Sequence, residues 1–301
     1  MNGRLLHIYR NTPLGRETLL QSIHFCKTLN LSLSIYIPES KRFLMCCGGE
    51  NSMLPIDLDE SYFVSPESAL PHAKELTKNK GTKPNWIIPE NDTAKSCPKI
   101  QGSFEFMCCP RCIKAPLSKL SVCYIDSLVR KIINTAQFPV LIPGPVYRPW
   151  KKITVFYGGS PNALNALKLG LQICRVSELP MDIFTQLESG GNKDIQNLIN
   201  NQTLKNKIDT VIDKWHQFNS GDFISNMFNV SHDALVLFGG FHSQKHRNFT
   251  SKKEKIQSGL PNNLLAVGPN FSELILAGPN AADLPSDAIQ DTKNLGISHY
   301  G

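Results

Sequence analysis

The chain has 301 residues, of which 41% are hydrophobic and 19% charged, and a formal net charge of +7. This composition is that of a globular protein and excludes a disordered chain, and the length favours two domains. No apolar run reaches the roughly 18 residues that cross a bilayer. The basic residues form neither a long block nor a stripe interleaved with aromatic residues, so we expect neither a membrane nor a nucleic acid as partner.

The N-terminal residues and the cysteines indicate the compartment. Met1–Arg10 enters a strand-like pattern directly and lacks the apolar stretch and cleavage site of a signal peptide. The nine cysteines are an odd number, which indicates reduced thiols rather than a disulfide framework. We therefore expect a cytoplasmic protein.

An internal repeat is the most informative feature of the chain. The runs Arg4–Tyr9 and Ile153–Tyr157 have strand character, and they are followed by Thr12–Pro13 and Ser160–Pro161 respectively. Thr or Ser can cap a helix by accepting a backbone N–H bond, and proline fits the first helical position. Both copies therefore predict a strand, a tight turn and a helix.

The helices and the strands after them also correspond. Each predicted helix has an apolar stripe at helical spacing, and strands are expected next at Leu31–Ile37 and Met181–Thr185. The two stripes consist of Leu19, Leu20, Ile23 and Cys26 in the first copy and of Leu164, Leu167, Leu171 and Cys174 in the second. Strands alternating with helices predict a parallel sheet with right-handed crossovers.

The ends of the two units match as well. Val140–Pro145 corresponds to Leu264–Pro269 at a separation of 124 residues, whereas Thr12 and Ser160 lie 148 residues apart. The first unit is therefore longer by 24 internal residues. The apolar run Ala234–Phe238, which ends at Gly239–Gly240, predicts a strand covered on both faces. We align it with Phe104–Met107, which ends at Cys108–Cys109.

The additional residues of the first unit predict their own elements. Arg42–Cys47 and Met53–Leu58 flank a glycine-containing turn, which indicates an added β-hairpin. Ser65 followed by Pro66 and an acidic residue predicts a helix that Ser65 caps and that runs to about Lys80. Asp57 and Asp59 suggest an exposed polar face of the hairpin rather than a catalytic pair.

The order of these elements resembles that of the universal stress proteins, and Phe138–Ile142 and Ile153–Pro161 carry the resemblance most clearly. It implies an α/β fold of two tandem doubly wound domains, adenine nucleotide alpha hydrolase-like, each with a mainly parallel five-stranded sheet. The expected domains are residues 1–147 with the insertion and 148–281, followed by a tail, 282–301. By the same resemblance, the last strands of the units should pack together as an internal pseudo-dimer.

The nucleotide-binding branch of that family has an Asp after the first strand and a glycine-rich phosphate loop after the fourth. This chain has Arg10 and Gly158 at the two Asp positions, and Pro110 removes an amide donor from the first loop. The second loop lacks a second glycine at the family spacing. We therefore expect degraded ATP sites and no cofactor. Nucleotide or anion binding in the second unit remains an alternative, through Gly158, Gly159, Ser160, Gly239 and Gly240.

The cysteines Cys108, Cys109 and Cys112 allow three interpretations. They could be buried structural thiols, a redox site if Arg111 or a helix terminus lowers the thiol pKa, or part of a metal site completed by Cys97 or Cys46–Cys47. A lone C-x-x-C is a weak zinc signal, and we assign no metal ligand.

Other polar residues are less specific. His242, Lys245, His246 and Arg247 could meet an anion or form a solvated loop. His7 and Asp126 are expected to be structural. No arrangement of residues indicates catalysis.

These observations and the resemblance lead to one main hypothesis. We expect a non-enzymatic stress-response or regulatory protein that acts as a scaffold or adaptor for a protein partner that the sequence does not identify. Two such chains could also form a homodimer. The alternatives are the nucleotide or anion site of the second unit and the thiol redox or metal sensor of the first, with weak ATP hydrolysis last.

Overall fold

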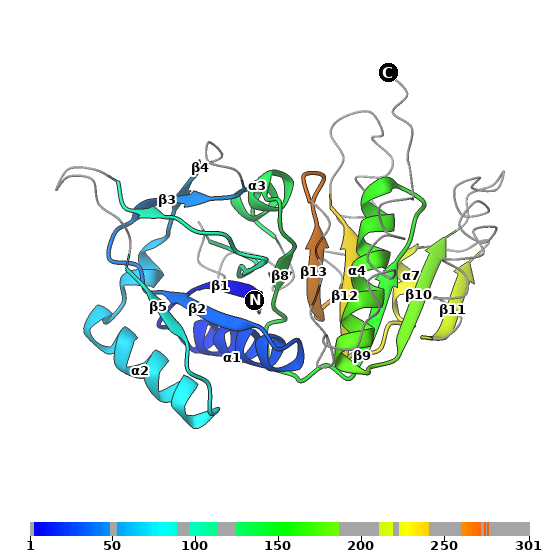
Figure 1. Ribbon diagram of the computed structural model, residues 1–301, viewed down its shortest axis with the longest axis horizontal. Helices are drawn as coiled ribbons and strands as arrows, with labels where there is room; N and C mark the ends of the chain where they lie inside the picture. Colours follow the sequence, from blue (N-terminus) through cyan, green and yellow to red (C-terminus); the bar gives the residue numbers. More distant parts are fainter. Residues whose placement is uncertain are drawn as a thin grey trace, which may run out of the picture.

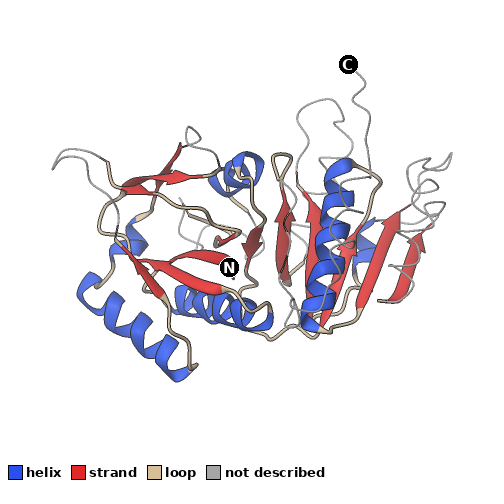
Figure 2. Ribbon diagram, viewed as in Figure 1, coloured by secondary structure: helices blue, strands red, loops and turns tan. Residues whose placement is uncertain are grey.

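The computed structural model describes residues 3–48, 53–88, 97–113, 125–186, 211–218, 223–240 and 260–271, together with Leu274 and Leu276. Its main feature is a ten-stranded sheet with helices on both faces, accompanied by a separate three-stranded sheet (Figures 1 and 2). Side chains that alternate along the strands supply two apolar cores, one on each face of the large sheet. The predicted α/β fold class is confirmed.

The large sheet consists of two halves of five parallel strands each, in the order β5-β2-β1-β7-β8 and β11-β10-β9-β12-β13. In the first half the strands are β1 (Arg4–Ile8), β2 (Ser32–Tyr36), β5 (Asn85–Ile87), β7 (Phe106–Cys108) and β8 (Val140–Ile142). In the second half they are β9 (Lys152–Phe156), β10 (Met181–Gln186), β11 (Ile212–Phe218), β12 (Ala234–Gly239) and β13 (Asn263–Val267). Five strands in each half agree with the prediction, but no residue range was predicted for the edge strands β5 and β11.

The two halves join through their last strands, as predicted. β8 pairs with β13 in antiparallel orientation, and Leu141 lies opposite Leu265. These two residues are 124 positions apart, so each faces its own counterpart in the repeat. Such pairing is that of an interface with twofold symmetry. The domain limits at residues 147 and 281 remain predictions.

The two longest helices begin as the sequence indicates. α1 (Pro13–Thr28) starts after Thr12, whose side chain accepts a hydrogen bond from the Gly15 amide at 3.0 Å. α4 (Pro161–Ser177) starts after Ser160, which accepts from the Ala163 amide at 3.2 Å. Both helices pack on one face of the sheet, and α3 (Ser127–Thr135) and α7 (Phe223–Met227) complete the described α-helices outside the insertion.

The inserted residues form the predicted hairpin and a third strand. β3 (Arg42–Cys46) pairs antiparallel with β4 (Met53–Asp57) and parallel with β6 (Lys99–Ile100). A 3-10 helix, η1 (Glu60–Phe63), and α2 (Pro66–Asn79) follow the hairpin. The predicted cap of α2 is wrong, because Ser65 has a left-handed conformation, with φ of 49°, and makes no side-chain capping bond.

Candidate functional site

In open parallel sheets, ligands bind beyond the carboxyl ends of the strands, where the strand order reverses. In this sheet the order reverses between β1 and β7 in the first half and between β9 and β12 in the second. We call these two places the first and second switch points. Residues that follow β1, β7, β9 and β12 form them, so they include the predicted candidate residues.

The strand registers show which residues of the two switch points correspond. Cys108 lies beside Leu141 in the first half, and Leu237 lies beside Leu265 in the second. Because Leu141 and Leu265 are counterparts, Cys108 lies level with Leu237 and belongs to the sheet core. Cys108 is not part of a phosphate loop.

Pro110 and Arg111 therefore occupy the positions of Gly239 and Gly240. The alignment of Cys108–Cys109 with that glycine pair is wrong by two residues. It compared the ends of two apolar runs, which differ in length, whereas the true correspondence is set by hydrogen bonding to the last strands. The first switch point thus has a proline and an arginine at the positions where the second switch point has two glycines.

The first switch point is occupied by side chains of the chain itself. The Arg10 guanidinium donates to the Asp59 carboxylate at 2.7 Å and to the backbone carbonyl of Cys112 at 3.3 Å. It lies 4.3 Å from the centre of the Tyr62 ring. The Arg10 and Asp59 side chains are 6% and 8% exposed, so the ion pair fills the space where a ligand of the first half would lie.

The structure corrects the interpretation of one hairpin carboxylate. Asp57 is partly exposed and pairs with Arg42 on the surface, as expected for a polar face. Asp59 is buried, and besides binding Arg10 it accepts a hydrogen bond from the Ser61 amide at 2.7 Å, which caps η1. No local signal indicates this pairing, since Arg10 and Asp59 are 49 positions apart in the sequence.

The cysteine cluster has the properties of structural thiols. Cys108, Cys109 and Cys112 are all buried. Burial raises the pKa of Cys108 to about 12 and that of Cys112 to about 11. Burial, reinforced by the Asp126 carboxylate, raises the pKa of Cys109 well above its usual value. These shifts oppose thiolate formation, on which redox reactivity depends.

The positive charge of Arg111 opposes the rise in the pKa of Cys112, but burial is the larger cause and the pKa stays raised. The Arg111 side chain reaches across the junction of the two halves and donates to the carbonyls of Leu260 at 2.9 Å and Asn262 at 3.0 Å. A further bond at 3.3 Å joins it to the Pro143 carbonyl. Arg111 is thus a buried link between the two halves.

Asp126 has the structural role expected of it. Its carboxylate accepts from the Val129 amide, which caps α3, and from the Ile113 amide at 2.5 Å. Within the described part of the chain, no three His, Cys, Asp or Glu side chains are grouped closely enough to hold a metal ion. The proposed completion by Cys97 or Cys46–Cys47 therefore finds no support there.

Among the residues that the structure describes, fewer side chains fill the second switch point. A Cβ atom added at Gly158 would meet no described atom within 4 Å. Gly159 has a φ of 80°, a conformation that favours glycine, and carries the chain into the turn that Ser160 ends by capping α4. Backbone at this turn can approach a ligand closely, so Gly158–Ser160 is the part of the candidate site that the geometry best supports.

Gly239 and Gly240 have packing roles instead. A Cβ at Gly239 would lie 2.6 Å from the Ala163 amide nitrogen at the start of α4. One at Gly240 would lie 3.0 Å from the Ile133 side chain of the first half. These glycines let β12 end against α4 and against the junction of the halves, which explains their presence without a ligand.

Two groups in the strands of the second half were missed. Lys152, at the amino end of β9 and so at the opposite end of the sheet from the second switch point, binds Asp182 at 2.9 Å. Closer to the carboxyl ends of the strands, the rings of Phe184 and His216 stack with their centroids 4.4 Å apart. A charged residue within an otherwise apolar strand is the sequence signal that could have revealed the Lys152–Asp182 pair, because a buried charge needs a partner. The loop candidates His242, Lys245, His246 and Arg247 lie outside the described residues.

The sheet order, the crossover helices and the joined halves together define an adenine nucleotide alpha hydrolase-like α/β fold. No family model and no curated protein matches the sequence. Among solved structures, the chain is similar to a universal stress protein from Archaeoglobus fulgidus, with 13% identity and a TM-score of 0.59, over 88% of this chain and 98% of that one. A functionally unknown protein from Pseudomonas aeruginosa is also similar, with 12% identity, a TM-score of 0.49 and coverage of 89% and 93%.

The first of these likenesses confirms the predicted universal stress protein fold. It extends over almost the whole length of the Archaeoglobus protein. Of the helices that the structure describes, none is both long and apolar enough to cross a membrane.

Proposed function

We propose that the chain is a non-enzymatic, cytoplasmic stress-response protein that acts by binding another protein rather than by using ATP. The observation that carries this proposal is the buried Arg10–Asp59 pair, which fills the first switch point. A ligand there would have to displace a desolvated ion pair, and leaving either charge buried alone is costly. The similarity of the fold to that of a universal stress protein supports the proposed role in a stress response.

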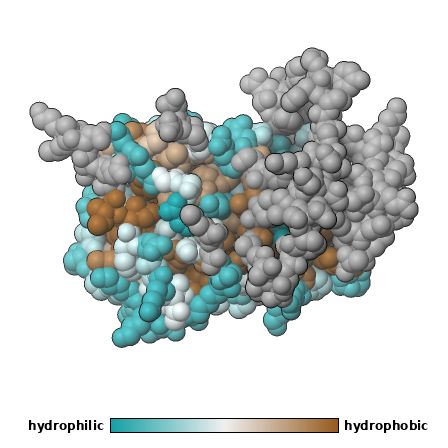
Figure 3. All heavy atoms as spheres, viewed as in Figure 1, coloured by the Kyte–Doolittle hydropathy of each residue, from teal (hydrophilic) through white to brown (hydrophobic). Residues whose placement is uncertain are grey.

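Surface features favour a protein as partner. β5 is an edge strand whose single neighbour among the described strands is β2. Apolar atoms reach the surface where β5 ends (Figure 3), and Ile88, the next residue, is 87% exposed. Unpaired strand edges and exposed apolar residues are both typical of binding surfaces. A second copy of the chain or another protein could pair there.

Thermal unfolding with and without nucleotide tests the proposal. With ATP, ADP or AMP in excess, we expect the melting temperature to stay unchanged. A ligand present at a hundredfold excess over its dissociation constant would instead add about 2.7 kcal/mol of stability. Native mass spectrometry of the purified protein should give the bare polypeptide mass, and a bound nucleotide would contradict the proposal.

The second candidate function is anion or nucleotide binding at the second switch point. It is favoured by Gly158, beside which no atom of the described residues lies within 4 Å of an added Cβ. Gly158→Arg would introduce the residue that occupies the same position in the first half. If nucleotide stabilises the native chain and not this variant, the second candidate replaces the first. Asn11→Ala at the first switch point is the matched control and should leave any such stabilisation intact.

A further inference from the structure

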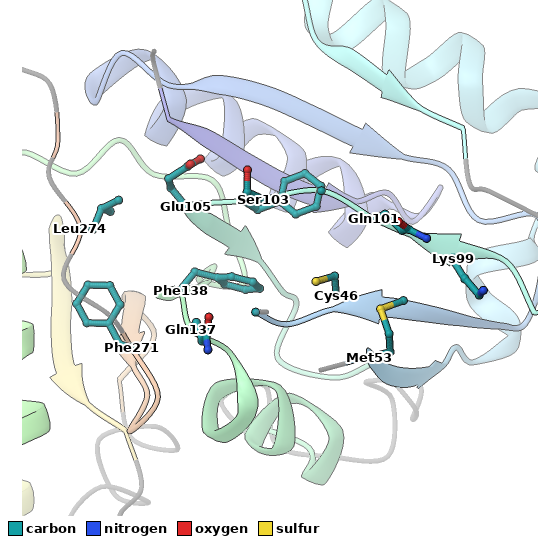
Figure 4. A pocket seen from close by; sticks show the side chains of 13 residues that line it. Cys46, Met53, Lys99, Gln101, Ser103, Glu105, Gln137, Phe138, Phe271 and Leu274 are labelled. Atoms are coloured by element: carbon teal, nitrogen blue, oxygen red, sulfur yellow. The ribbon is translucent and has the colours of Figure 1, made fainter. Parts of the chain in front are cut away.

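The inserted residues form one wall of a cavity in the first half of the chain. It has a volume of about 770 Å³ and lies between the small sheet and the edge of the large sheet where β7 and β8 begin (Figure 4). One wall is the inserted segment, including Cys46, Met53 and Lys99. Phe271 and Leu274, which follow β13, close the opposite side. Both halves of the chain therefore contribute to it.

The interior of the cavity is aromatic. Phe104, Phe138 and Phe271 line it together with Met53 and Leu274. Phe104 and Phe138 are almost fully buried at 8% and 5% exposure, whereas Phe271 is half-buried. A cavity lined by aromatic rings and a thioether favours a ligand with a flat apolar ring, since aromatic pairs and sulfur–ring contacts both stabilise such a ligand.

The polar groups of the cavity are mixed in charge. Lys99 and Glu105 carry opposite charges at the two ends of one extended segment, with Gln101 and Ser103 between them (Figure 4). One Glu105 oxygen already accepts from the Arg4 amide at 2.5 Å. The exposed Gln101 side chain, like that of Gln137 on the opposite wall, offers both donors and an acceptor. The side-chain amides of Gln101 and Gln137, together with one positive and one negative side chain, suit an uncharged ligand that has hydrogen-bonding groups.

We infer that this cavity binds an uncharged, flat aromatic molecule with hydrogen-bonding substituents. Its volume lies in the range of about 300–1,000 Å³ that is typical of ligand pockets, which are mostly apolar with a few placed polar groups. The insertion then has two effects. It fills the first switch point with Asp59 and builds a binding site elsewhere. This inference does not depend on the proposed protein-binding function.

Methionine methyl signals in an NMR spectrum test the inference directly. Met53 lines the cavity, whereas Met181 lies buried in the second half. We expect benzamide and 7-hydroxycoumarin to shift the Met53 signal in a saturable way while the Met181 signal stays in place. Benzoate and benzylammonium, which match benzamide in size, should bind about tenfold more weakly or less.

Two variants locate the binding. Ser103→Trp adds an indole to an exposed position on the cavity wall, so it should fill the space without removing core contacts and abolish the Met53 shift. Phe228→Ser removes an aromatic ring that is 84% exposed in the second half and should leave the shift unchanged. Binding that leaves Met53 unmoved, survives Ser103→Trp or favours a charged probe would overturn the inference, as would no binding of any probe.

Discussion

The two halves of the sheet share one topology but differ where ligands are expected. The first switch point has a large cation, Arg10, neutralised by Asp59 from the insertion. The second has Gly158 at the position of Arg10, with no described atom near its missing side chain. The difference teaches that this fold keeps its architecture while the contents of its switch points change, because the strands and helices depend on the cores beneath.

The same contrast extends into the core. In the first half, His7 Nδ1 lies 2.8 Å from the Ser22 hydroxyl, and both residues are buried. Their counterparts, 148 residues later, are Val155 and Gly170. A Cβ at Gly170 would lie 2.8 Å from a Val155 methyl. Equivalent positions thus hold a hydrogen-bonded polar pair in one half and a branched apolar residue against glycine in the other.

Loss of the Asp59 carboxylate should have the largest effect. Asp59→Ala leaves the Arg10 guanidinium buried without its partner, and removal of one member of a buried ion pair costs about 3–5 kcal/mol. Urea denaturation should show this loss in the free energy of unfolding. Adding Arg10→Met should restore part of it, because no unpaired charge then remains.

Two further variants separate charge from other effects. Asp59→Asn keeps an acceptor for the Ser61 amide, so its remaining loss measures the ion pair and hydrogen bond with Arg10. Asp57→Ala removes a carboxylate from the exposed pair with Arg42 and should change stability little, since solvent screens such pairs. Equal effects at Asp57 and Asp59 would show that the first switch point is not closed by a buried pair.

Arg111→Met should have the next largest effect. It leaves the carbonyls of Leu260 and Asn262 without their donor, and an unsatisfied buried acceptor costs about 1–3 kcal/mol. Because Arg111 joins the two halves, the urea transition should also become less steep as they unfold less cooperatively. Arg175→Met is the control, since the hydrogen bond that Arg175 makes to a described residue lies within the second half, to the Leu276 carbonyl. A similar loss of steepness there would contradict the linking role.

Much of the fold could be predicted from the sequence because it depends on local signals. The caps Thr12 and Ser160, the prolines after them and the apolar stripes all act within a few residues. The paired last strands followed from the resemblance, and β8 and β13 confirm them. The edge strands β5 and β11 were missed, because an edge strand is only partly buried and lacks a continuous apolar pattern.

The candidate sites could be predicted less well, because they depend on contacts between distant residues. The Arg10–Asp59 pair and the reach of Arg111 to Leu260 follow from tertiary structure alone. The role of Cys108 was misplaced because apolar runs do not set strand register. The role of Gly158 and Gly159 in ligand binding stays a prediction; the structure adds that Gly159 has a φ of 80°, a conformation that favours glycine.

The buried polar pair of the first half predicts a pH dependence. Burial lowers the pKa of His7 to about 3, from about 6.5 for an exposed imidazole. The unfolded chain therefore binds a proton that the folded chain does not as pH falls below about 6.5. Stability should drop by about 1.4 kcal/mol for each pH unit between 6.5 and about 3 on this account.

Replacing His7 and Ser22 with the residues at the same positions of the second half isolates the contribution of His7 to the pH dependence of stability. The double variant His7→Val, Ser22→Gly should have a smaller fall in unfolding free energy between pH 7 and pH 5 than the native chain. Val155 and Gly170 show that the fold accepts this combination. If both proteins lose stability in parallel, other groups such as His24, whose pKa burial also lowers, account for the acid sensitivity.

The smallest expected effect is at Gly158. Gly158→Ala adds a methyl group where no described atom lies within 4 Å, and Gly158 does not have the left-handed conformation that excludes alanine. Reduced freedom of the unfolded chain should then stabilise the protein by about 0.4–1 kcal/mol. Gly239→Ala is the matched variant at the same end of the sheet. Its methyl group would meet the backbone of α4 at 2.6 Å, so we expect a loss of about 1–3 kcal/mol.

The sign of the Gly158→Ala effect decides between two views of the second switch point. A gain in the free energy of urea unfolding means that the space beside Gly158 is free in the folded chain and can admit a ligand. A loss as large as that of Gly239→Ala means that the space is filled. The second switch point would then be as closed as the first, and the contrast between the halves would lie only in which residues close them.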